Sequence, residues 1–259
     1  MFDFCYPLLE NVVPYLERIG WQGDIKPDKT TLDALIYAHQ RSVPFENLSA
    51  CGLTEQNSLA IPELYKKVVA GRRGGYCFEL NGIFMTLLRA LGYDAYSCMA
   101  RVASGTELRP VMHRAIIVRL DGRQYYCDVG FGGAMAPFAV ELSARVQSAL
   151  GENYWVEEAA EEWLVLYRRF DTENEGKPVI VFSTLPFLNE DFTTFHLYCS
   201  RNPESAFTEG PFLYRRTANG FLSYDEGVLS GMENGQKLNR RIPNEELRAM
   251  MAELFDLYI

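Results

Sequence analysis

The stretch Arg72-Arg73-Gly74-Gly75-Tyr76-Cys77-Phe78-Glu79-Leu80-Asn81 marks the point at which a glycine-rich turn runs into an amphipathic helix. Beyond it, apolar residues recur at the spacing of one buried helical stripe: Leu80, Ile83, Phe84, Leu87, Leu88 and Leu91. Gly92 then supplies a typical helix stop. Cys77 therefore lies at a helix N-terminus, where backbone N–H groups and the helix dipole favour negative charge. We expect Cys77 to ionise readily and to act as a nucleophile.

The composition is that of an ordinary globular protein. The chain has 259 residues, 48% hydrophobic and 23% charged, enough for one large domain or two to three small ones. With 25 Lys and Arg against 34 Asp and Glu, and no basic stripe, nucleic acid is not an expected partner. The first residues lack the pattern of a secretory signal, and no stretch has the length of a membrane span. We expect a cytoplasmic protein with no membrane partner.

The cysteines follow no short-range pattern. They are Cys5, Cys51, Cys77, Cys98, Cys127 and Cys199. This spacing indicates neither a disulfide framework nor a CxxC zinc site, so each is expected to be a free thiol in a reducing compartment. We expect five of them to pack as small apolar side chains, because free cysteine is among the most buried residue types. Only Cys77 has a position that favours reaction.

Before Gly92 the sequence has a helical character. The spacing predicts a helix over 31–41 and a short helix that Pro62 opens and Gly71 ends. After Gly92 the periodicity changes to that of short strands, and it changes again near residue 200. These changes predict three units, 1–92, 93–200 and 201–259.

The strand signals after Gly92 are short apolar runs separated by turn residues. They predict strands over 95–102, 113–120, 123–131, 164–170 and 179–183. Residues 171–178 are polar turn formers and predict a solvated hairpin loop. Further strands are expected within 220–229, and Asn244 is predicted to cap a final helix.

The dipeptide Asp121-Gly122 lies between two apolar runs and is a strong signal for a two-residue hairpin, because a type I′ turn needs positive φ at both positions. If the residues on either side of this turn face each other, Ala115 lies opposite Asp128 and His113 lies opposite Gly130. These residues then share one face of the sheet. His113 and Asp128 become diagonal neighbours, within reach of an imidazole and a carboxylate.

This arrangement suits nucleophilic catalysis. An adjacent imidazole activates a thiol, and a carboxylate on its second nitrogen holds the tautomer and stabilises the imidazolium. Cys77, His113 and Asp128 are therefore the candidate triad. His113 alone would be read as a structural histidine, but Asp128 lies in an otherwise apolar run, where an ionised carboxylate needs a partner.

A zinc site is the competing interpretation of these residues. Cys127 could be imagined as a further ligand, but Cys127 and Asp128 are consecutive on a strand and point to opposite faces. We therefore expect no metal. His39 is predicted to be a structural histidine hydrogen-bonded near the core, and nothing around His196 favours catalysis.

Three motifs carry a resemblance to a known family. They are Val43-Pro44-Phe45-Glu46-Asn47-Leu48, Arg73-Gly74-Gly75-Tyr76-Cys77-Phe78-Glu79-Leu80-Asn81 and Asp128-Val129-Gly130-Phe131-Gly132-Gly133. In this order they resemble the arylamine N-acetyltransferase family, and the segments 182–187 and 191–192 extend the match. His196 stands where the family commonly has an asparagine.

The resemblance implies an α+β fold with an N-terminal helical bundle, a central antiparallel β-barrel and a C-terminal α/β lid. Its core is that of transglutaminase-like and papain-like cysteine enzymes. The three units predicted above would then be the bundle with the nucleophile, the barrel with His113 and Asp128, and the lid.

The resemblance also implies a ping-pong acetyl transfer. Cys77 would take an acetyl group from acetyl-CoA as a thioester and pass it to the nitrogen of an arylamine or arylhydrazine, with His113 managing protons and Asp128 orienting it. The loop Gly130-Phe131-Gly132-Gly133 would border the acyl-donor site, with Phe131 near the acceptor ring. The alternatives are an amide synthase or a hydrolase that uses the same triad, and a silent binding protein on the same fold.

Two charged residues within the motifs predict a structural contact. Because a buried charge usually needs a partner, Glu46 and Arg73 are expected to form a salt bridge that links the turn at 45–47 to the loop before Cys77. Arg72 is expected to be solvated, or at most to assist the binding of anionic donor groups.

Overall fold

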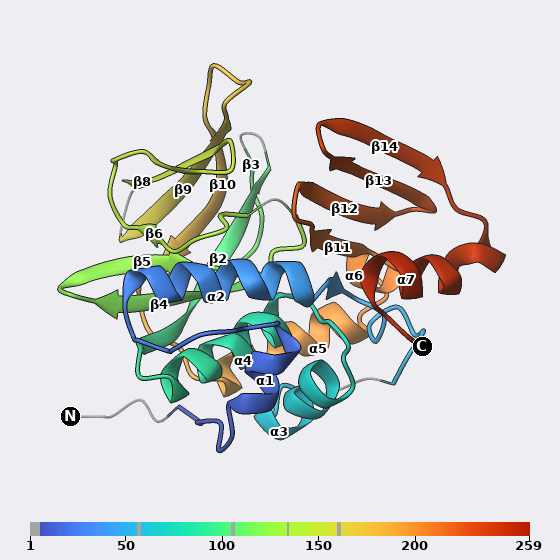
Figure 1. The fold of residues 1–259 in the computed structure, drawn as a ribbon, viewed down its shortest axis with the longest axis horizontal. Coiled ribbons are helices and arrows are strands. Elements are labelled where there is room, and N and C mark those ends of the chain that lie inside the picture. Colours follow the sequence, from blue (N-terminus) through green and yellow to red (C-terminus); the bar gives the residue numbers. More distant parts are fainter. Residues whose placement is uncertain (1–5, 56–57, 105–106, 134, 160–161) are drawn as a thin grey trace.

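The computed structural model describes residues 6–55, 58–104, 107–133, 135–159 and 162–259. Figure 1 shows helices along the lower side, a curved sheet at the upper left and a second sheet at the upper right. The fold is therefore α+β, with helices, an antiparallel barrel and a C-terminal sheet with its own helix, which confirms the predicted fold class. No helix in the described ranges is long and apolar enough to cross a membrane.

The described N-terminal part is helical. It contains α1 (Val13–Arg18), α2 (Lys29–Ser42), α3 (Ile61–Leu64), the π-helical turn η1 (Tyr65–Ala70) and α4 (Cys77–Ala90). The predicted helix over 31–41 is confirmed as α2, which begins earlier because Asp28 caps it by accepting a hydrogen bond from the Thr31 N–H at 2.8 Å. The helix that Pro62 opens is confirmed as α3 and η1. The apolar pattern does not predict α1, because its 6 residues are too few to show a period.

Helix α4 is buried from Cys77 to Leu88. Its apolar side chains share one core with α2 and with one face of the barrel sheet: Leu80, Ile83, Phe84, Leu87 and Leu88 with Leu32, Leu35, Ile36, Ile116 and Val118. Burying each such side chain stabilises the fold by about 1.5–3 kcal/mol. Because this core holds α4 between α2 and the barrel, the position of its first residue, Cys77, is fixed.

The barrel sheet has the strand order β6-β5-β4-β2-β10-β9-β8-β7, with β3 beside β2. Its strands are β2 (Asp94–Ser104), β3 (Glu107–Leu108), β4 (His113–Leu120), β5 (Arg123–Cys127), β6 (Val140–Glu141), β7 (Gln147–Ala149), β8 (Glu152–Glu158), β9 (Trp163–Phe170) and β10 (Lys177–Ser183). Neighbouring strands are antiparallel, and the loop over 171–176 joins β9 to β10 as a hairpin. The end of the sheet at β6 approaches β8, where the Val156 N–H donates to the Ser143 carbonyl at 2.9 Å, and this contact nearly closes the barrel.

The C-terminal sheet has the order β1-β11-β12-β13-β14. Its strands are β1 (Phe45–Glu46), β11 (Leu213–Arg216), β12 (Gly220–Asp225), β13 (Val228–Glu233) and β14 (Gln236–Arg241). Helix α7 (Leu247–Phe255) packs on it through Met251 and Phe255, and β14 is an exposed edge strand. The predicted cap at Asn244 is wrong, because Asn244 begins a 3₁₀ turn (Asn244–Glu246) and Glu246 is the cap of α7.

The segment before this sheet returns to the N-terminal helices. It consists of η2 (Glu190–Phe192), α5 (Thr193–Arg201) and α6 (Ala206–Glu209). Figure 1 shows α5 next to α4, and the ring of Phe195 on α5 stacks with that of Phe78 on α4. Phe192 and Cys199 share an apolar cluster with Tyr76, Cys77 and Phe78, so this segment covers the start of α4.

Candidate active site

The candidate triad lies where one helix and two strands begin or end. Cys77 is the first residue of α4, His113 is the first residue of β4, and Asp128 directly follows β5. The His113 Nε2–H donates to Asp128 Oδ2 at 2.6 Å, and the Cys77 sulfur lies near enough to the imidazole to raise the pKa of His113. All three residues are at least 97% buried. The predicted proximity of His113 and Asp128 is confirmed, and Cys77 lies beside them.

The hairpin between β4 and β5 has the predicted turn. Asp121 and Gly122 have φ values of 50° and 74°, and Leu120 pairs with Arg123. However, the strand predicted over 123–131 ends at Cys127, so Asp128 and Gly130 have no ladder partners on β4. The predicted ladder pairs of Asp128 with Ala115 and of Gly130 with His113 are therefore wrong, although the two catalytic candidates do share a face.

Asn81 explains why the strand ends there. Its Oδ1 accepts the Val129 N–H at 2.9 Å, and its Nδ2 donates to the Arg114 carbonyl at 2.6 Å and to Asp128 Oδ1 at 2.9 Å. A side chain of α4 thus replaces the hydrogen bonds that would continue the sheet. This role was not predicted, although an asparagine one helical turn after Cys77 on an otherwise apolar face was the signal for it.

Asp128 is held as a carboxylate. Oδ2 also accepts the Tyr126 hydroxyl at 2.8 Å, and Oδ1 accepts the Gly130 N–H at 2.9 Å. Burial alone would raise the pKa of Asp128, but the charge of His113 and these hydrogen bonds lower it below the usual value. A buried carboxylate with this many donors is well suited to orient an imidazole.

The environment of His113 favours its protonated form. Burial alone would lower the pKa of His113, but the charge and hydrogen bond of Asp128, together with the Cys77 sulfur, raise it above the ordinary value. The ring of Phe131 stands edge-on to the imidazole, with the ring centres 5.8 Å apart. The site is therefore built to hold an imidazolium between a carboxylate and a sulfur.

The other described cysteines differ from Cys77. Cys98, Cys127 and Cys199 are buried and Cys51 is partly buried, and burial raises the pKa of each of these four thiols. They are free thiols that stay neutral, which agrees with the predicted packing role. Cys5 lies outside the described residues.

The loop Gly130-Phe131-Gly132-Gly133 packs directly on the nucleophile. A Cβ at Gly130 would lie 2.9 Å from the Cys77 Cα, so only glycine allows this approach. Gly132 has a φ of 76° and lies against the Phe45 ring. Phe131, Gly132 and Gly133 also line a cavity of about 20 Å³, which Tyr214 of the C-terminal sheet lines as well.

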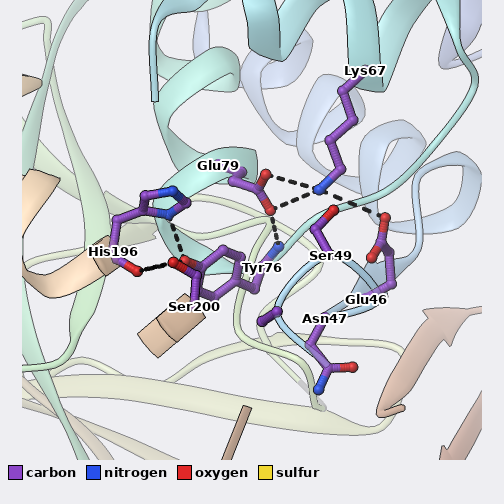
Figure 2. A pocket seen from close by; sticks show the side chains of 9 residues that line it. Glu46, Asn47, Ser49, Lys67, Tyr76, Glu79, His196 and Ser200 are labelled. Carbon is purple, nitrogen blue, oxygen red and sulfur yellow. Dashed lines mark hydrogen bonds and ion pairs between the residues drawn. The ribbon is translucent and has the colours of Figure 1, made fainter. Parts of the chain in front are cut away.

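A buried ion-pair network lies behind the start of α4. Arg73 Nη2 lies 2.7 Å from Glu46 Oε1, so the predicted salt bridge is confirmed. Lys67 Nζ lies 2.8 Å from Glu79 Oε1 and 3.7 Å from Glu46 Oε1 (Figure 2). Lys67 was not predicted at this site, because its burial depends on two carboxylates that are distant in the sequence.

His39, His196 and Arg72 lie outside the candidate triad. Tyr15 and His39 Nε2 form a buried hydrogen bond of 3.0 Å, which confirms the structural role predicted for His39. The Tyr76 hydroxyl bonds to His196 Nδ1 at 2.5 Å beside a cavity of about 10 Å³ (Figure 2). Arg72 is exposed, as predicted, and forms an ion pair with Asp256 at 2.9 Å.

Zinc coordination does not match this geometry. Cys127 belongs to the apolar core between α4 and the sheet, whereas Asp128 faces His113. Within the described residues, no three His, Cys, Asp or Glu side chains are grouped to hold a metal ion.

Comparison with known proteins places the chain in a family. Residues 28–259 match the family model described as N-acetyltransferase. The arylamine N-acetyltransferase of Escherichia coli (strain K12) is 30% identical over 257 residues, which cover 97% of this chain and 89% of that protein. The chain belongs to the arylamine N-acetyltransferase family. The resemblance seen in the three motifs is thereby confirmed.

Solved structures of arylamine N-acetyltransferases share this fold. The Salmonella typhimurium protein is 26% identical with a TM-score of 0.88, over 97% of this chain and 92% of that chain. The Mycobacterium marinum protein in complex with CoA is 26% identical with a TM-score of 0.87, over 95% of this chain and 92% of that chain. The chain is therefore an acetyltransferase of a family that uses acetyl-CoA.

Proposed function

We propose that this chain transfers an acetyl group from acetyl-CoA to the nitrogen of an arylamine or arylhydrazine through a thioester on Cys77. The observation that supports this proposal best is the hydrogen-bonded pair of His113 and Asp128 beside Cys77 at the buried start of α4. Arylamines are named as substrates of the relatives, and one relative is also named an N-hydroxyarylamine O-acetyltransferase.

In the first half-reaction, the Cys77 thiolate attacks the thioester carbonyl carbon of the donor. A new C–S bond forms to Cys77, and the bond from the carbonyl carbon to the CoA sulfur breaks. His113, protonated before the attack, gives its proton to the leaving CoA thiolate. Asp128 keeps the imidazole in place through Nε2, and a backbone N–H at the start of α4 stabilises the oxyanion.

In the second half-reaction, His113 acts as a base. The amine nitrogen attacks the acetyl carbon on Cys77, His113 takes the amine proton, and the bond to the Cys77 sulfur breaks to regenerate the thiolate. The imidazolium and thiolate pair present at the start is thereby restored. One sulfur therefore serves both the donor and the acceptor, which is a ping-pong scheme.

The loop Gly130-Phe131-Gly132-Gly133 is proposed to border the donor site, with Phe131 near the acceptor ring. Its glycines allow close approach of backbone amides to a ligand, and the Phe131 ring already packs against the imidazole.

Intact-mass measurement tests the proposal. After incubation with acetyl-CoA alone, we expect the protein to gain the mass of one acetyl group, and the Cys77→Ala variant to gain none. Adding an aminobenzoate should remove the acetyl group and yield the N-acetylated product. If no acetyl group is taken up, the transferase proposal is wrong; if it is lost equally fast without an amine, the chain is a hydrolase with the same triad.

A cytoplasmic location and the three units 1–92, 93–200 and 201–259 are also proposed. Free thiols at the five described cysteines suit a reducing compartment. For the units, limited proteolysis should cut first near residues 92 and 200, and cuts elsewhere would argue against these boundaries.

A further inference from the structure

Arg114 is a fully buried cation outside the candidate triad, with no exposed surface. Its Nε donates to Ser97 Oγ at 2.9 Å, and its Nη1 donates to Asn189 Oδ1 at 2.8 Å and to the Phe78 carbonyl at 3.2 Å. Among the described residues, no carboxylate lies within 4.0 Å of it, and its Nη2 has no hydrogen-bond partner. All its hydrogen bonds are to neutral groups.

This placement is unfavourable for the fold by itself. Removing a cation from water costs several kcal/mol unless an anion or a full set of hydrogen bonds compensates. Helix α4 has a glycine where the guanidinium packs, because a Cβ at Gly82 would lie 2.7 Å from Arg114 Nη1. A mid-helix glycine lowers the stability of the fold by about 0.5–1 kcal/mol relative to alanine. We therefore expect the buried charge of Arg114 to have a function that outweighs these two losses of stability.

The guanidinium lies against the first turn of the helix that carries the nucleophile. Phe78, whose carbonyl it binds, follows Cys77 directly, and Gly82 lies one turn further along α4. Arg114 itself follows His113 on β4, and its backbone carbonyl accepts the Asn81 amide at 2.6 Å. Strand β4 thus presents two consecutive groups to the start of α4.

We propose that Arg114 is a positioning residue that supplies the counter-charge of the Cys77 thiolate. The inference deepens the proposed function and rests on Cys77 being its nucleophile. A cation behind the first turn of α4 adds to the helix dipole and stabilises an anion at that position. His113 then need not be the only positive group that keeps the sulfur ionised.

The charges that act on Arg114 agree with this role. Burial lowers the pKa of Arg114 to about 9, and the largest opposing influence is the negative charge of the Cys77 thiolate. The guanidinium therefore remains charged at neutral pH. The face of Phe192, with its centre 4.5 Å from the guanidinium carbon, further favours the cation.

The experiment measures the alkylation of Cys77 by iodoacetamide as a function of pH, followed by mass spectrometry of the Cys77 peptide. Only the thiolate reacts, so the midpoint of the rate profile reports ionisation without any acetyl transfer. Arg114→Met keeps the length of the side chain and removes its charge, whereas Arg114→Lys keeps the charge. We expect Arg114→Met to shift the midpoint upward by one pH unit or more, which slows alkylation below the midpoint about tenfold. Arg114→Lys should restore most of the rate.

A folded Arg114→Met variant with an unchanged midpoint would overturn the proposal, as would equal shifts in the Met and Lys variants. If Arg114→Met does not fold, Arg114→Gln, which retains amide donors, replaces it with the same expected shift. A shifted midpoint in a chain that takes up no acetyl group would reject the proposed function but support the role of Arg114. Acetyl uptake on Cys77 with an unchanged midpoint would support the proposed function and reject the role of Arg114.

Discussion

Asp128 accepts hydrogen bonds from four groups, and each oxygen accepts two. An asparagine at this position would present an NH₂ group to two donors and could not complement the imidazolium. We expect Asp128→Asn to slow acetylation of Cys77 roughly 10²–10⁴-fold, the range of a lost acid–base function. Single-turnover mass spectrometry with acetyl-CoA measures this rate.

Tyr126→Phe is the matched control for this change. It removes one hydrogen bond to Asp128 Oδ2 and keeps the carboxylate. We expect the acetylation rate to stay within about tenfold of the natural chain, since one such bond contributes about 0.5–1.5 kcal/mol. Equal losses in both variants would mean that the charge of Asp128 is unimportant.

His113 makes the stability of the fold depend on pH. Its pKa rises from 6.5 to about 10, because Asp128 and Cys77 outweigh the effect of burial. Its stabilising contribution is therefore complete below pH 6.5 and is lost as the pH rises toward 10. We expect the difference in unfolding free energy between the natural chain and His113→Asn to shrink by more than about 1.4 kcal/mol between neutral and alkaline pH, measured by urea unfolding.

His39 provides the opposite case. Burial lowers the pKa of His39 from 6.5 to about 3, so it is neutral in the folded chain. Its contribution is present above pH 6.5 and is lost as the pH falls toward 3. The free-energy difference between the natural chain and His39→Gln should therefore shrink on acidification. The same direction of pH dependence for both histidines would contradict the assigned environments.

At the scale of elements, α4 and β4 meet through Gly82 and Arg114. A methyl group at Gly82 would collide with Nη1, so Gly82→Ala is expected to destabilise the chain by about 1–3 kcal/mol despite the better helix propensity of alanine. In an Arg114→Leu background, whose side chain is shorter, the same change should stabilise by about 0.5–1 kcal/mol. Urea unfolding of the four chains measures the coupling. An equal effect of Gly82→Ala in both backgrounds would show that the two residues do not interact.

The sequence predicts an element when the residues that determine it lie within that element or in the adjoining turn. The stripe after Cys77 predicts α4, and Asp121-Gly122 predicts the register that brings His113 near Asp128. The end of β5 could not be predicted in this way, because it is caused by Asn81 on another element. Arg114 was missed for the same reason: the groups that it binds come from β2, α4 and the segment before η2.

At the scale of the molecule, the parts are joined by contacts that no local pattern shows. Strand β1 is two residues long, yet it pairs Phe45 with Tyr214 and so attaches the C-terminal sheet to the N-terminal helices. Helix α5 (Thr193–Arg201) has few apolar residues on a regular face, and its place is set by the cluster around Phe192. Periodicity alone does not predict either contact.

The buried network around Glu46 is expected to be a major contributor to global stability. Glu46→Gln leaves Arg73 and Lys67 with less compensating charge in a site where Glu46 has no exposed surface. We expect it to reduce the unfolding free energy by about 3–5 kcal/mol, measured by urea unfolding.

Asp256→Asn is the control, because it breaks the ion pair of the neighbouring Arg72, whose side chain is 57% exposed. An exposed pair contributes about 0–1 kcal/mol, so this variant should unfold nearly as the natural chain does. A comparable loss in the two variants would show that burial does not decide the strength of these pairs.

The edge strand β14 has β13 on one side and solvent on the other. Lys237, Arg240 and Arg241 lie along it, and five of its six residues are exposed. A second molecule that tried to add its own strand there would bring a like-charged row against this one. We therefore expect concentrated solutions to resist strand-by-strand growth into fibrils.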